Sequence, residues 1–224
     1  MEIVSVVLIV VSALLIVGLL WVVGTYNGFV RLRNLVEESW RQIDVELHRR
    51  HDLIPNLVET VQGYAAHERD VLTDVTSART AAASPPAAPV QQAERESQLS
   101  TALGRLLAQV TAARGAAASP SAGPAQQAQH ENQLSAALGR LLAVTEAYPQ
   151  LRASESFLHL QSELTNTEDR IAAGRRFYNA NVRALNTKVE SFPSNAVAHA
   201  VGVSRAEYFE IEDPAVRAVP RVDF

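Results

Sequence analysis

The chain has 224 residues and no cysteine, which excludes disulfide bonds and thiolate chemistry. It carries 20 basic and 24 acidic residues, a balance that argues against a dedicated nucleic-acid-binding protein, since such proteins present a basic face. Its 10 glycines and 10 prolines are clustered, and they leave long runs that are open to helix formation.

The N-terminal segment Ile3–Val23 contains no charged residue. As a helix of 21 residues it would be about 31 Å long, close to the thickness of a bilayer's hydrocarbon core. Trp21 and Tyr26 stand where an interfacial aromatic belt is expected. A cleavable signal peptide is disfavoured because the basic n-region and the A-x-A site are missing. We therefore expect residues 1–25 to form an uncleaved transmembrane anchor that contacts the lipid bilayer through residues 3–23.

The charges that flank this segment predict its orientation. Glu2 precedes it, whereas Arg31, Arg33 and Arg41 follow it. The positive-inside rule then places the N-terminus outside the cell and the C-terminal domain in the cytoplasm.

Residues 26–203 carry apolar side chains at three- and four-residue steps, which predicts an all-α fold in which the anchor continues into an antiparallel up-and-down helical bundle. We expect the first helix to run from the anchor to about Arg50. Asp52 would cap a second helix, with Pro55 in its first turn, where the missing N–H costs nothing. Residues 204–224 are expected to form an extended tail, in which the segment Tyr208–Ile211 could pack along the bundle.

The last long helix has the most regular apolar pattern, and Pro193 ends it. The residues of this stripe are Phe157, Leu160, Leu164, Ile171, Tyr178, Val182, Leu185, Val189 and Phe192.

The middle of the chain contains a tandem duplication. Val75–Gln109 and Val110–Val144 are identical at 25 of 35 positions. Each copy holds a helix end, a loop with prolines and a helix start, so the duplication predicts one extra helix, at about residues 91–118. The apolar stripe of this helix, which includes Leu103 and Val110, needs a partner surface. Because insertions are tolerated best at loops, the bundle is expected to fold without the second copy.

Seven short motifs occur in an order that resembles the LemA family of bacterial membrane-anchored helical proteins. They are Tyr26-Asn27, Arg50-x-Asp-Leu-Ile-Pro-Asn-Leu-Val58, Gly63-Tyr64-Ala65-x-His67-Glu68, Glu146-x-Tyr-Pro-x-Leu151, Thr167-Glu-Asp-Arg-Ile171, Arg175-Arg-Phe-Tyr-Asn179 and Phe192-Pro193. The resemblance covers the whole chain except one copy of the repeat. It implies a single-pass protein of the bacterial cell membrane and association with envelope maintenance.

No constellation of residues predicts a catalytic, cofactor-binding or metal site. His67-Glu68 lacks the second histidine of a zinc-protease helix, because position 71 is Val71. His48 and His51 could share a helix face with Asp44, but the neighbouring arginines would repel a cation there. The pattern favours solvated or capping histidines.

A charge run on the last helix favours a solvated face with i,i+4 ion pairs. Its members are Glu163, Glu168, Asp169, Arg170, Arg175 and Arg176. The alternative is a polar network in which Asn179 and Asn186 set the helix register from inside the bundle.

The segment Asp52, Leu53, Ile54, Pro55 and Asn56 is the candidate partner-docking site. Its structural interpretation is a turn in which Asp52 caps, Pro55 sets the angle, and the apolar side chains plug the end of the bundle. Its functional interpretation is a docking surface for another protein.

The sequence favours a membrane-anchored helical scaffold or adaptor of the bacterial envelope, with no enzymatic activity. The alternative is a membrane-linked sensor or signal transmitter, since a transmembrane helix that enters a bundle can relay motion. The expected partner is a membrane or envelope protein, with a membrane protease as one candidate from the resemblance. Homo-oligomerisation is a further option, and no nucleic acid is expected.

Overall fold

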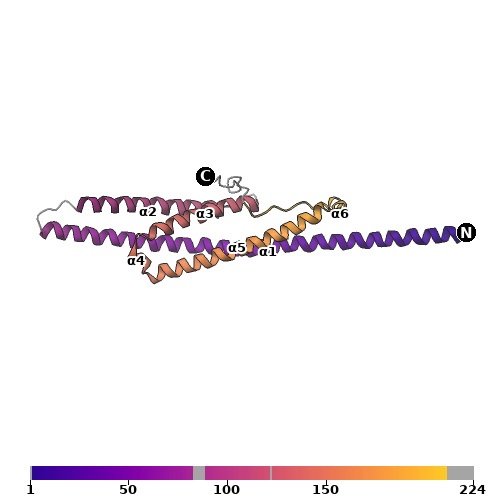
Figure 1. Ribbon diagram of the computed structural model, residues 1–224, viewed down its shortest axis with the longest axis horizontal. Helices are drawn as coiled ribbons and strands as arrows, with labels where there is room; N and C mark the ends of the chain where they lie inside the picture. Colours follow the sequence, from indigo (N-terminus) through magenta and orange to yellow (C-terminus); the bar gives the residue numbers. More distant parts are fainter. Residues whose placement is uncertain (1, 83–88, 122, 211–224) are drawn as a thin grey trace, which may run out of the picture. The chain divides into compact units, whose positions relative to one another are not determined.

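The computed structural model describes residues 2–82, 89–121 and 123–210, with side chains described for residues 2–66, 98–121 and 123–210 (Figure 1). These residues form helices and no strand, so the all-α prediction is confirmed. The helices are α1 (Glu2–Ala82), α2 (Pro89–Ala117), α3 (Pro124–Thr145), α4 (Pro149–Arg152), α5 (Glu155–Glu190) and α6 (Ser194–Ala200). The chain divides into two compact units: unit 1 contains Met1–Asp44 and Ala172–Phe209, and unit 2 contains Val45–Ile171.

In unit 1, α1 and α5 pack side by side and run in opposite directions. A Cβ atom added at Gly174 would lie 3.0 Å from Ile43 Cγ1, and Lys188 Nζ lies 4.9 Å from the centroid of the Phe29 ring. The Gly174–Ile43 and Lys188–Phe29 contacts are therefore separated by the same number of residues on both helices. The residue numbers rise along α5 and fall along α1, as expected for an antiparallel pair. Phe29 is 1% exposed and packs against α5 and α6.

Two buried asparagines on α5 hold the segment that follows α6. Asn186 accepts a hydrogen bond from the Ala206 N–H (2.8 Å) and donates one to the Ala206 carbonyl (2.9 Å). Asn179 pairs in the same way with the backbone of Phe209 (2.9 and 3.4 Å). The alternative hypothesis was right that these asparagines are buried, but their bonds position the tail segment rather than the helix register.

Aromatic side chains also pack around the tail segment at Phe209. Phe209 is fully buried, with the Trp40 ring 5.3 Å away between centroids and the Arg175 guanidinium 4.9 Å above its face. Tyr178 lies 5.5 Å from Trp40 and donates its hydroxyl to the Glu207 carbonyl (2.9 Å). Burial, followed by the Glu207 charge, raises the pKa of Tyr178 to about 12. The Phe209 part of the expected tail packing is confirmed, and residues 211–224 lie outside the described part.

In unit 2, side chains of α1, α2, α3 and α5 share one apolar core, and α4 adds Leu151 to it. The extra helix expected from the duplication is α2, which packs along α3. Leu103 and Val110 are 2% and 0% exposed, so the apolar stripe of α2 finds its partner in the core of this unit. Ile54, Leu57 and Val61 supply the α1 face of the same core.

The expected turn at residues 52–56 is wrong, because α1 continues through Pro55. A proline inside a helix removes the N–H that would bond the carbonyl four residues earlier, which here is the carbonyl of His51. Arg114 on α2 replaces that donor, since its Nε donates to the His51 carbonyl at 2.8 Å. The hydrogen bond lost to Pro55 is therefore restored from a neighbouring helix, and the helix does not have to end.

A buried polar network as the candidate functional site

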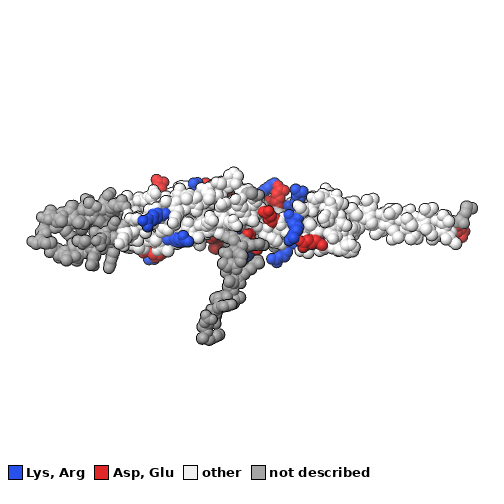
Figure 2. Space-filling view, turned by 90° about the horizontal axis from the view of Figure 1, so that it is seen from above, with Lys and Arg blue, Asp and Glu red and all other residues white. Residues whose placement is uncertain are grey.

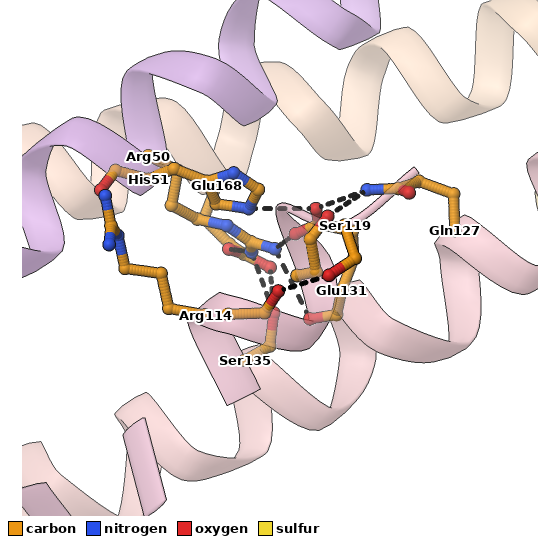
Figure 3. Close-up of polar contacts among 10 residues, drawn as sticks. Arg50, His51, Arg114, Ser119, Gln127, Glu131, Ser135 and Glu168 are labelled. Carbon is orange, nitrogen blue, oxygen red and sulfur yellow. Dashed lines mark hydrogen bonds and ion pairs between the residues drawn. The ribbon is translucent and has the colours of Figure 1, made fainter. Parts of the chain in front are cut away.

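Unit 2 encloses a polar network that four helices build around Arg50 (Figure 3). Arg50 and His51 come from α1, Arg114 from α2 and Glu168 from α5. The remaining members are on α3: Gln127, Glu131 and Ser135. Figure 3 shows the side chains of Arg50, His51, Gln127 and Glu131 turned toward one another between the helices.

Arg50 is the centre of the network and is 1% exposed. Its guanidinium bonds the Glu131 carboxylate and donates to the Ser135 hydroxyl (2.9 Å) and to Glu168 Oε2 (2.5 Å). Its second terminal nitrogen also reaches the Glu131 carbonyl at 3.3 Å. A buried guanidinium is tolerated only where acceptors replace its lost water, and these contacts supply acceptors for its two terminal nitrogens, whereas Nε has none among the described residues.

Glu131 is also 1% exposed, and three side chains satisfy its carboxylate. Besides Arg50, His51 Nε2 lies 3.0 Å from Glu131 Oε1, and Gln127 Nε2 donates to the same oxygen at 2.9 Å. Burial by itself raises the pKa of Glu131, but the hydrogen bond to His51 and the Arg50 charge outweigh it and leave the pKa below its usual value. The carboxylate is therefore held in its charged form.

This arrangement ties helices together and leaves little for a ligand to bind. Arg50 and Glu131 direct their charge at each other and are closed to solvent. Within the side chains that the structure describes, no three His, Cys, Asp or Glu residues are grouped to hold a metal ion. The contacts in this network are charge-assisted hydrogen bonds in a desolvated setting. They fix one packing arrangement of the helices.

The five residues of the candidate docking segment lie on α1 near this network. Asp52, Pro55 and Asn56 are exposed, Leu53 is half-buried, and Ile54 is 1% exposed within the core. Ile54 is therefore not accessible to a partner in this fold. Docking through the three exposed residues stays a prediction.

Two other interpretations of polar residues need correction. His51 is buried against Glu131 rather than solvated, whereas His48 is exposed as expected. The acidic members of the charge run pair mainly across helices: Glu163 with Arg49 (2.5 Å) and Glu168 with Arg50. These contacts lie between α5 and α1, because the two helices run side by side here, so i,i+4 pairing does not describe them.

Glu131 is absent from the candidate residues named from the sequence, although the sequence contains a signal for it. Glu131 stands in line with Leu134, Leu138 and Leu141, the buried stripe of α3. A carboxylate at an apolar position of a helix indicates a buried partner of opposite charge. The repeat places Glu96 at the equivalent position of the first copy.

Besides its two residues in the network, α1 carries the apolar segment that was expected to be the anchor. It is, among the described residues, the one helix long and apolar enough to cross a membrane, and that stretch is unburied. Figure 2 shows it free of charged residues except at its tip. Together with the helical units, this segment defines a membrane-associated helical protein.

The particular family follows from sequence comparison. The LemA family model matches residues 39–109 and 105–224, and the chain belongs to the LemA family. Each match contains one copy of the duplicated segment, as the internal repeat requires.

Several similar proteins align with most of the chain. Magnetosome protein MamQ 2 of Paramagnetospirillum magneticum is 29% identical over 212 residues, covering 92% of this chain and 74% of the relative. Magnetosome protein MamQ of Magnetospirillum gryphiswaldense is 26% identical over 191 residues (85% and 66%). Protein LemA of Metamycoplasma hominis is 22% identical over 201 residues (90% and 74%).

The lowered pKa of Glu131 predicts a pH dependence of stability. The unfolded chain takes up a proton at the ordinary value of 4.5, above the pKa in the folded state. The stabilisation is thus complete above pH 4.5 and is lost as the pH falls through the folded-state pKa, because the unfolded state then binds more protons. Denaturant unfolding of the full chain in detergent at pH 7 and at acidic pH measures this loss.

We expect the Glu131→Gln variant to show a flatter pH profile across that window. Glu146→Gln is the matched control, because Glu146 is 59% exposed in its pair with Arg152. A Glu131→Gln profile parallel to that of the unmodified protein would show that this carboxyl does not carry the dependence.

Proposed function

We propose that this protein is a membrane-anchored helical scaffold of the bacterial envelope that holds a partner membrane protein beside its bundle, without catalysing a reaction. The observation that carries the proposal is that two parts of α1 have different surroundings. The helix bears an unburied apolar segment of membrane-spanning length, and the same helix supplies the buried residues Arg50 and His51 to the polar network of unit 2.

The state of the ionisable groups supports a non-catalytic role. A catalytic acid or base must reach a substrate within hydrogen-bond distance. Glu131 is the buried carboxylate with a shifted pKa in unit 2, and its oxygens are taken by Arg50, His51 and Gln127. Its charge is therefore engaged in joining helices.

A scaffold also needs an accessible, well-ordered surface. On α1 the residues Asp52, Pro55, Asn56 and Glu59 are exposed at spacings of three and four residues, so they form one stripe on the side opposite Ile54 and Leu57. The core and the polar network fix the orientation of this stripe. We propose it as the partner surface, in place of a docking turn.

In-cell photocrosslinking tests this proposal. A photoreactive residue replaces Asn56 in the full chain, and a matched probe replaces Gln133, an exposed amide on α3 in the same unit. We expect the probe at position 56 to capture one membrane protein reproducibly and the probe at 133 to capture none. Equal capture at both positions, or capture at neither, would contradict a partner surface on this stripe.

A further inference from the structure

The turn between α5 and α6 exposes a large apolar side chain. Phe192 is the last member of the apolar stripe of the long C-terminal helix, and the stripe residues before it are buried or half-buried. Phe192 is instead 87% exposed, just past the end of α5. Val201, at the other end of α6, is 42% exposed. A single exposed phenylalanine is common on protein surfaces, so what matters here is its position relative to the apolar segment of α1.

The antiparallel register of unit 1 gives the position of Phe192 along α1. Lys188 lies against Gly28 and Phe29, and Phe192 comes four residues later on the chain that runs the opposite way. Phe192 is thus level with about Thr25. Packing of α6 agrees, because Val197 and Ala198 belong to the same buried apolar cluster as Phe29.

That level coincides with the end of the apolar segment of α1. If the segment Ile3–Val23 spans the hydrocarbon core, Thr25 stands about 3 Å beyond its end. Trp21 and Tyr26 flank the same level and are 43% and 45% exposed, as expected for aromatic side chains at the headgroups. Phe192 would then meet lipid where the anchor leaves the bilayer.

Basic side chains lie on the side of this level away from the apolar segment. Arg31 and Arg33 are exposed on α1, six and eight residues beyond Thr25. Burial and the Arg31 charge lower the pKa of Lys188, so these two cations lie close enough to repel each other. Lipid phosphates between them would relieve that repulsion, and cations about one to two turns above an apolar tip match the order of phosphates above acyl chains.

We propose that the α5–α6 turn is a second membrane contact, in which Phe192 enters the boundary between headgroups and acyl chains while Arg31, Arg33 and Lys188 face the phosphates. The occupant of this apolar tip is the bilayer that holds α1. Continuity with the anchor supports lipid rather than another protein, since the tip and the end of the membrane segment lie at one level.

The cysteine-free chain makes the test direct. Phe192→Cys is labelled with an environment-sensitive fluorophore in the full-length protein. The protein is reconstituted at one copy per nanodisc of phosphatidylcholine and phosphatidylglycerol, with or without lipids brominated near the headgroup. The matched control is Phe177→Cys. Phe177 is a second exposed phenylalanine on α5 (53% exposed) and lies roughly 20 Å farther from the membrane segment along the helix.

We expect blue-shifted emission at position 192, quenched severalfold by the brominated lipids, and neither effect at 177. Emission at 192 that matches 177 would overturn the proposal. A blue shift that brominated lipid fails to quench would also overturn it, because the tip would then be covered by protein. Helical circular dichroism of both labelled variants checks that the fold is intact. These readouts do not depend on capture at Asn56, so either proposal can fail alone.

Discussion

Arg50→Ala is expected to lower the free energy of unfolding by about 3–5 kcal/mol, because it leaves the Glu131 carboxylate buried without its cation. Arg50 and Glu131 are each 1% exposed, so water cannot replace the lost guanidinium. His51 and Gln127 would still contact the carboxylate, but neither carries a permanent charge. Denaturant unfolding of the full chain in detergent, followed by circular dichroism, measures the change.

Glu168→Ala is the matched control, because the same guanidinium bonds both carboxylates. Glu168 is 50% exposed, so we expect its removal to cost less than about 1 kcal/mol. The paired replacement Arg50→Met with Glu131→Leu should recover most of the loss, since apolar residues of similar volume often substitute for a buried ion pair. Equal losses for Arg50→Ala and Glu168→Ala would contradict a buried network centred on Arg50.

The apolar patterns predicted much of this fold because burial depends on spacing that the sequence displays directly. Phe157, Ile171, Tyr178 and Leu185 are buried as their steps along the last helix indicate. Phe192 follows the same pattern and is exposed, because the helix ends before it can pack. Periodicity thus predicts a stripe but does not show where the opposing surface stops.

Local signals failed where the deciding partner lies far along the chain. Pro55 favoured a helix start, and nothing near it indicated that Arg114 would bond the His51 carbonyl. The burial of His51 likewise depends on Glu131, which is 80 residues away. Such contacts arise only from the packing of α2 and α3 against α1, so one helix's own sequence cannot predict them.

The duplication makes one such long-range partner testable. A chain that lacks Val110–Val144 is expected to fold, because the first copy contains an identical residue for each network member that is deleted. The deleted residues are Arg114, Gln127, Glu131 and Ser135, and their counterparts 35 positions earlier are Arg79, Gln92, Glu96 and Ser100. Cooperative thermal melting of the shortened protein measures the outcome.

The position of Arg114 beside His51 constrains the path of the helices in the shortened chain. In the full chain, residues 102–117 of α2 lead back to the level of His51, where Arg114 bonds its carbonyl. Their counterparts are residues 67–82, which would have to run back about 24 Å as a helix. We therefore expect α1 to end and reverse near Gly63 in the shortened protein, so that Glu96 reaches Arg50.

Glu96→Gln in the shortened chain should consequently cost about 3–5 kcal/mol, as expected for removal of one partner of a buried ion pair. Glu94→Gln is the control, since the second copy has glutamine at the equivalent position, the exposed Gln129. We expect that control to change stability by no more than about 0.5 kcal/mol. If the two variants are equally stable, Glu96 does not replace Glu131. Loss of cooperative melting in the shortened parent would instead show that the bundle requires the second copy, because deleted core residues such as Val110 and Leu134 would then have filled a core that one copy cannot complete.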